Sequence, residues 1–288
     1  MGALKYLMIG LCTVCVLQAE EADTVASCEH PVSDEIHSLS PENRTSLTVS
    51  YTAGAGMLGF EFVGIPVLSR YFNWKKPVKW GNPFDNVRET EPYLHDDAWH
   101  FVGANITSEI NYHILSEYFG MEDPLLTAGL LSLAFWTGME CLDGLTGAGF
   151  SVRDQTANTL GAAFGVLKLH NPDIPIYFRV GVENWGRFLM FAKSGFDRNK
   201  TGTDYYSIFK TELIYVFDND LYAGVALSKG RGKENYSNRF GISVGYELLN
   251  DIGENEDSWL YQSLDFFRRH VVLAIGVTYW PDQLEFEY

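Results

Sequence analysis

The chain has 288 residues, of which 46% are hydrophobic, 15% aromatic and 20% charged. This composition excludes a globally disordered protein, and a mean hydropathy of −0.08 excludes an ordinary polytopic membrane protein. With 21 basic against 37 acidic residues the net charge is −16, so the chain lacks the positive surface that attracts nucleic acids or anionic lipids. We therefore expect no nucleic-acid partner.

Residues 1–19 predict a secretory signal peptide. Lys5 precedes an apolar run at residues 6–17 that is too short to span a bilayer, and the small residue Ala19 precedes two glutamates. An uncleaved N-terminal anchor is the alternative. The mature chain keeps Cys28 and Cys141, for which two unpaired thiols are the preferred interpretation and a single disulfide in an oxidising compartment is the alternative.

The first half of the mature chain predicts helices. Residues 20–44 are polar and predict a linker, and residues 45–170 predict a helical domain. Apolar residues at helical spacing place about four helices there. They cover residues 47–68, 96–119, 125–142 and 151–168. The segment 47–68 is long enough to span a bilayer, although a core helix is equally consistent with it. Ser151 is a predicted N-cap, with Asp154 three residues on.

Residues 171–288 predict a β-domain. Large apolar residues alternate with small or polar ones in four runs, 176–182, 209–217, 240–248 and 271–279. This period of two predicts an antiparallel meander of roughly six to eight strands. The fold class is therefore α+β, a helical bundle followed by an antiparallel meander that can curl into a barrel.

The side of the sheet that faces the core has two interpretations. In a soluble protein the large residues, Val244 and Ile275 among them, would pack on the helices and leave water. In an outer-membrane barrel they would face lipid, and residues such as Ser243 and Thr278 would fill the interior. The alternation by itself fits both.

The helical half carries three pairs of polar residues. Asp96 and His100 are four residues apart, Glu140 and Asp143 three, and Asp154 and Asn158 four, so each pair shares one helical face. A buried structural network is the plainest interpretation. Acid–base catalysis is a second, with His100 polarised by Asp96 and the other four residues as further candidates, and a divalent metal held by His100, Glu140, Asp143 and Asp154 is a third. The sequence shows no nucleophile motif, phosphate-binding loop or other cofactor motif.

These residues resemble the YfiM-type family of periplasmic lipoproteins, which carry a domain of unknown function. The resemblance rests on DDAWHF at 96–101 and on MECLDGLTGAGFSVRDQTANTLGAAFG at 139–165, and it covers about residues 45–168. A more distant similarity extends to VanZ-like membrane proteins. The family's pattern of Asp, His, Glu, Asp, Asp, Asn and Gly falls on Asp96, His100, Glu140, Asp143, Asp154, Asn158 and Gly161.

Two departures make this cluster more acidic than the family pattern. Asp97 and Met139 stand where the family has lysines. The resemblance implies a protein exported to the periplasm or outer membrane of a bacterium, and it implies no reaction. We expect a non-enzymatic envelope protein, structural or binding, that associates with a membrane. The alternatives are a metal-dependent or acid–base hydrolase, and a small outer-membrane β-barrel with a periplasmic helical domain.

Overall fold

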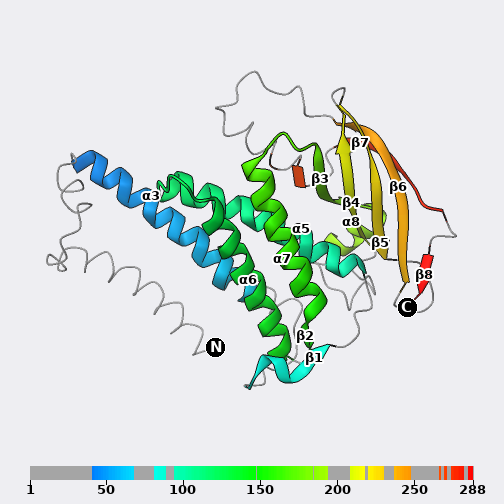
Figure 1. The fold of residues 1–288 in the computed structure, drawn as a ribbon, viewed down its shortest axis with the longest axis horizontal. Coiled ribbons are helices and arrows are strands. Elements are labelled where there is room, and N and C mark those ends of the chain that lie inside the picture. The colour runs from blue at the N-terminus through cyan, green and yellow to red at the C-terminus, as the bar shows by residue number, and fades with distance from the viewer. Residues whose placement is uncertain are drawn as a thin grey trace. The chain divides into compact units, whose positions relative to one another are not determined.

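The structure is a computed structural model (Figure 1). It describes residues 41–67, 81–88, 94–146, 148–183, 185–193, 208–217, 220–229, 237–247, 266, 269–270, 274–281 and 285–287. The predicted signal peptide, Cys28 and most of the predicted linker lie outside these residues. The described chain is mixed, with helices in its N-terminal part and an antiparallel sheet in its C-terminal part, which confirms the predicted fold class.

The chain divides into two compact units. The first contains described residues 41–65 together with His113–Glu122. Its helix α3 (Pro41–Gly59) continues into a π-helix, Phe60–Gly64, and a second π-helix covers Ile114–Tyr118. Within this unit the Tyr51 and Phe119 rings meet edge to face at 5.5 Å. Helix α3 begins at Pro41, so the last four residues of the predicted linker are helical.

The second unit contains three long helices and the sheet. Helices α5 (Leu94–His113), α6 (Leu125–Thr146) and α7 (Val152–His170) lie close to their predicted positions. A 3-10 helix, Pro83–Asn86, leads into β1 (Val87–Arg88), which pairs in parallel with β2 (Phe150–Ser151). This short pairing fixes the chain directly before α7 begins.

Small and hydroxylated residues hold α5, α6 and α7 together. The Oγ atoms of Thr107 and Ser132 lie 2.6 Å apart between α5 and α6, and Ser132 Oγ also donates to the Ala104 carbonyl at 2.7 Å. Gly161 of α7 lies so close to α5 that an added Cβ would stand 2.2 Å from the Phe101 carbonyl oxygen. The close approach of α5 and α7 thus depends on a residue without a side chain.

The sheet follows the chain order of its strands. It contains β3 (Ile176–Val182), β4 (Phe209–Val216), β5 (Leu221–Lys229), β6 (Ser237–Glu247) and β7 (Ala274–Tyr279), and the short β8 (Glu285–Glu287) pairs with β6. Among the described residues this gives six strands, within the predicted range. Helix α8 (Trp185–Lys193) interrupts the predicted run of strands between β3 and β4.

The two faces of the sheet differ in chemistry. One register row joins Phe178, Leu213, Val225, Ile242 and Tyr279, and the face that carries this row is called the outer face. The other, called the inner face, carries Arg179, Glu212, Ser243 and Glu247, all of them buried. The polar face is therefore the covered one.

This arrangement corrects the soluble interpretation of the meander. Val244 is 51% exposed and Ser243 is completely buried, so Val244 does not leave water within the described chain. The side chain of Ile275 lies outside the described residues. The alternation itself is real, but most of the large residues point outward, as in the interpretation that placed small and polar residues inside.

The sheet curls toward its inner face. Lys210 of β4 donates to the Thr278 hydroxyl of β7 at 2.6 Å, although two strands separate them in the sheet. Arg179 of β3 likewise forms an ion pair with Glu247 of β6. Gly276 provides room for the curl, because an added Cβ there would stand 2.1 Å from the Tyr222 hydroxyl. The concave inner face is thus filled by its own side chains.

One end of the outer face packs on the helices of the same unit. Phe178 of β3 contacts Phe101 of α5 and Phe164 of α7, with ring centroids 4.2 and 5.1 Å away. Trp99 of α5 meets Phe209 of β4 edge to face at 5.4 Å. Helix α5 therefore contacts the sheet as well as α6 and α7, and it also carries the first two residues of the predicted cluster.

Candidate functional site

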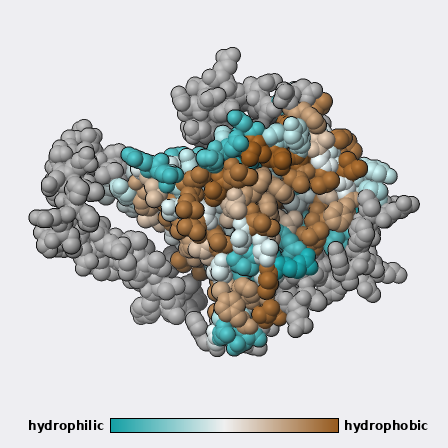
Figure 2. Space-filling model, viewed as in Figure 1, coloured by the Kyte–Doolittle hydropathy of each residue, from teal (hydrophilic) through white to brown (hydrophobic). Residues whose placement is uncertain are grey.

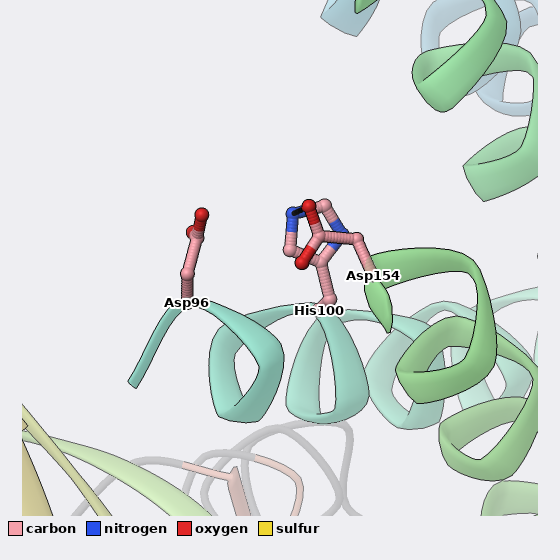
Figure 3. A group of neighbouring side chains, drawn as sticks. All are labelled: Asp96, His100 and Asp154. Carbon is pink, nitrogen blue, oxygen red and sulfur yellow. Dashed lines mark ion pairs between the residues drawn. The ribbon is translucent and has the colours of Figure 1, made fainter. Parts of the chain in front are cut away.

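The polar cluster forms where α5, α6 and α7 meet. Asp96 and His100 project from the same side of α5, and Asp154 lies at the start of α7 with its carboxylate beside the imidazole (Figure 3). Glu140 near the end of α6 and Asn158 in α7 both approach the ring nitrogen Nδ1 of His100. Pairs that are distant in the sequence thus converge on one histidine.

The contacts of His100 differ between its two nitrogens. Nδ1 lies 3.2 Å from Asn158 Oδ1 and 3.5 Å from Glu140 Oε1, whereas Nε2 lies 3.7 Å from Asp154 Oδ2. An amide oxygen and a carboxylate oxygen can only accept hydrogen bonds, so these neighbours favour the tautomer that carries its proton on Nδ1. In the neutral imidazole this leaves the lone pair on Nε2, on the side of Asp154.

The start of α7 is built around Ser151. Its backbone is extended, and its Oγ accepts a hydrogen bond from the Asp154 N–H at 3.0 Å, which confirms the predicted N-cap. The Ser151 N–H in turn donates to Glu140 Oε2 at 3.2 Å. This bond offsets the poor position of a carboxylate near the C-terminal end of α6. The cap thus ties Glu140 and Asp154 into one network.

Burial decides which groups a ligand can reach. Glu140 and Asn158 are completely buried and Asp154 nearly so, but the His100 side chain is 16% exposed and Asp96 is half-buried. The Asn158 Nδ2 amide has no hydrogen-bond partner among the described residues. The cluster is therefore a half-open site, closed behind the imidazole and accessible on the side of Asp96.

Three of the residues are close enough to hold a metal ion. One ligand atom each from Asp96, His100 and Asp154 lies within 4.8 Å of the other two. Of the residues predicted as metal ligands, His100 and Asp154 belong to this group, and Asp96, predicted for catalysis, completes it. Glu140 lies by Nδ1 of the ring, and Asp143 is not a member of the group.

Asp143 has a role at the end of α6. Its backbone carbonyl accepts hydrogen bonds from the Gly149 N–H at 3.1 Å and the Thr146 hydroxyl at 3.2 Å. Gly149 has a φ of 98°, a conformation that favours glycine, and it turns the chain toward β2. The segment between the two predicted helices is therefore the turn that brings Ser151 back to Glu140.

Several residues around the site were not predicted. The Trp136 ring stands edge-on to His100 at 5.3 Å and donates its Nε1–H to the Thr107 hydroxyl. Arg153 of α7 forms an ion pair with Asp97 of α5. Nothing in the sequence marks these contacts, because each joins residues from different helices.

Cys141 lies next to Glu140 and is a free thiol. Burial raises the pKa of this thiol above its usual value, and the negative charge of Glu140 raises the pKa further. Such a thiol stays protonated near neutral pH and is a poor nucleophile. Cys141 is therefore a structural residue at the edge of the cluster.

Helix α6 is also the most apolar helix. Among the described residues it is the helix long and apolar enough to cross a membrane, and 28% of its most apolar window is buried. A core helix of a soluble protein passes the same test of length and composition.

Comparison with protein-family models, curated proteins and solved structures found no match to the chain. The YfiM-type resemblance therefore remains a prediction.

Proposed function

We propose that this protein is a bacterial envelope protein that binds a divalent metal ion through Asp96, His100 and Asp154, without catalysing a reaction. The observation that carries the proposal is the orientation of His100. Asn158 and Glu140 occupy the Nδ1 side of the ring, and the two aspartates lie with Nε2. A histidine fixed through one nitrogen, with carboxylates beside the other, is the usual arrangement of a metal-binding histidine.

The size of the group supports this proposal. Ligand atoms on opposite sides of an octahedral metal are about 4.4 Å apart and adjacent ones about 3 Å apart, given metal–ligand distances near 2.2 Å. The three candidate atoms lie within 4.8 Å of one another. A small inward movement of Asp96, which is half-buried, would bring them to ligand distance.

The donor set favours a first-row transition ion. Carboxylate oxygens suit magnesium, calcium and manganese, whereas an imidazole nitrogen suits zinc, copper, iron and nickel. One imidazole with two carboxylates therefore favours Mn²⁺ or Zn²⁺ over Mg²⁺.

Binding is better supported than hydrolysis. The Ser151 hydroxyl, which belongs to the hydrogen-bond network of the cluster, is buried and serves as a helix cap. The Cys141 thiol is held protonated by burial and by Glu140, since its pKa is raised. Neither of these two side chains is available as a nucleophile, and the proposal therefore assigns the ion a structural role, in which it joins α5 to α7.

The envelope location rests on the sequence. The apolar run at residues 6–17 and the small residue Ala19 have the pattern of a signal peptide. The resemblance to periplasmic lipoproteins agrees with this pattern. A protein in the periplasm or outer membrane is also exposed directly to the divalent cations of the cell's surroundings.

The test is a metal titration of the purified full chain. After treatment with a chelator, Mn²⁺ or Zn²⁺ should raise the melting temperature saturably, and Mg²⁺ should do so only weakly. At a free metal concentration 100 times Kd, binding to the folded state alone adds about 2.7 kcal/mol to the free energy of unfolding. Calorimetry should give about one site per chain.

Matched variants identify the ligands. Asp96→Asn keeps the shape of the side chain but removes its charge, and it should abolish most of the metal-induced rise in melting temperature. Asp143→Asn makes the same change outside the three-residue group, so the rise should persist. If all three metals leave the melting temperature unchanged, or if Asp96→Asn and Asp143→Asn respond alike, the proposed site is wrong.

A further inference from the structure

The outer face of the sheet carries a broad apolar surface. Over β4 to β7 its large side chains are from 37% to 69% exposed. They are Leu213, Tyr215, Leu221, Val225, Ile242, Val244, Tyr246, Val277 and Tyr279. Figure 2 shows hydrophobic residues at the surface over the strands of the sheet. Soluble monomers rarely expose an apolar surface that extends over four neighbouring strands.

The inner face buries charged residues, which makes the exposure of apolar residues on the outer face more unusual. Arg179 and Glu247 form an ion pair with both side chains completely buried, and Lys210 pairs with the buried Glu212. Burying charges while exposing valines is costly in water. The cost on the outer face disappears when an apolar medium covers it, because hydrocarbon needs no hydrogen bonds from the side chains it contacts.

We propose that the outer face of the sheet lies against the hydrocarbon of a lipid bilayer. The outer-face positions of β5 from Leu221 to Leu227, which alternate along the strand, and their partners on β4 and β6 carry no charged side chain among the described residues. A protein partner would be expected to meet polar groups and hydrogen-bond donors around its contact. An uncharged, mostly aliphatic face matches lipid tails instead.

The ends of the outer face suit the boundary of a membrane. Tyr215 and Phe217 end β4 as an aromatic pair, with ring centroids 5.0 Å apart, and the Tyr246 hydroxyl nearby donates to Asp220 at 3.3 Å. Tyrosine rings with an apolar body and a polar tip gather at the level of lipid headgroups. A groove of about 720 Å³, lined in part by Leu221, Val244 and Val277, is large enough for part of an acyl chain.

The contact is made by a face of the sheet and does not cross the membrane. Among the described strands β7 pairs only with β6, so its other edge has backbone groups that need water or another partner. Such an edge is not tolerated in the hydrocarbon core. Helix α5 already covers one end of the outer face through Trp99 and Phe209. The remaining part of the face is the surface left for lipid.

Vesicle flotation of the full chain tests this inference independently of the metal site. The probe is phosphatidylcholine vesicles, which carry no net charge, because a chain of net charge −16 is repelled by anionic lipids. The wild type should float with the vesicles, and the bound fraction should not fall at high salt, since apolar contacts are not screened.

Variants of the outer face should bind the vesicles more weakly than the wild type. Val244→Asp with Val277→Asp should lower the partition coefficient by about tenfold or more, because a carboxylate enters hydrocarbon poorly. Leu160→Asp on α7, at a similarly exposed apolar position, is the control and should float as the wild type does. An aspartate variant that does not fold would also fail to bind. The double variant Val244→Thr with Val277→Thr therefore tests the same surface while it keeps the β-branched shape of both side chains.

The alternative occupant is a second copy of the chain. A wild type that stays out of the vesicle fraction, and that forms a dimer by light scattering which the two aspartates dissociate, overturns the lipid assignment in favour of a dimer. A soluble monomer also overturns it. Flotation that is equal in the wild type and both double variants shows that another surface holds the membrane.

Discussion

The inner face of the sheet depends on a small number of buried charged residues. Arg179 donates to Glu247 with both side chains inaccessible, and the Arg179 guanidinium also lies 5.2 Å from the Tyr177 ring centroid. Removing one partner of such a pair leaves an uncompensated charge and typically costs about 3–5 kcal/mol. These residues therefore select one register for the curled sheet, because a slip of one position would carry them to the outer face.

Tyr222 is the residue whose ionisation should reveal this interior. Its pKa is raised to about 12. Burial is the largest cause, the negative charges of Glu212 and Glu247 also raise the pKa, and Arg179 lowers it. A tyrosine whose folded pKa exceeds its unfolded value of 10.0 stabilises the fold below pH 10.0. This contribution is lost as the pH rises from 10.0 toward about 12.

We therefore predict a steeper alkaline loss of stability in the wild type than in Tyr222→Phe. Urea unfolding at about pH 9 and about pH 11.5 measures the free energy of unfolding on both sides of the transition. Tyr215→Phe removes a hydroxyl from the neighbouring strand at an exposed position, and it should keep the wild-type pH dependence. Identical profiles for all three proteins would show that Tyr222 is not buried among the carboxylates.

At the scale of elements, the site depends on how closely the helices approach. Gly161 brings α7 against the backbone of α5 at Phe101, and Asn158, one turn earlier, then reaches His100. Gly138 of α6 is a helical glycine with open space around it, since an added Cβ would have nothing within 4 Å. Gly161 and Gly138 therefore provide a test position and its control for the effect of an added methyl group.

Replacing each glycine by alanine should have opposite effects. Gly161→Ala forces the helices apart and should lower the free energy of unfolding by about 1–3 kcal/mol. Gly138→Ala only reduces the freedom of the unfolded chain, so it should raise the free energy by about 0.5–1 kcal/mol. Chemical denaturation gives both values, and a stabilising Gly161→Ala would contradict the close contact between α5 and α7.

At the scale of the whole molecule, the proposed envelope location requires processing of the N-terminus. Mass spectrometry of the mature protein should find a chain that begins near Glu20, after cleavage behind Ala19. Leu7→Arg interrupts the apolar run and should block cleavage, whereas Lys5→Arg keeps the charge and should be processed normally. A cellular protein that still begins at Met1 would exclude a cleaved signal.

The elements were largely predictable because they depend on local pattern. Helical spacing placed α5, α6 and α7 within a few residues of their observed bounds, and Ser151 was identified as a cap because capping needs only a nearby N–H. Alternation located β3, β4, β6 and β7. Helix α8 was missed because it is a short amphipathic segment between strands, where an alternating pattern was expected to continue.

The sequence by itself determined the fold class and indicated the residues of the cluster apart from Asp143, because period and spacing fix which side chains share a face. Only the tertiary structure decided that Asp96, His100 and Asp154 form the metal-sized group, since the positions of three helices set those distances. It also decided that Val244 faces outward and Ser243 inward. An alternating strand has an apolar and a polar face in either medium, and only the packing around the sheet decides which face is covered.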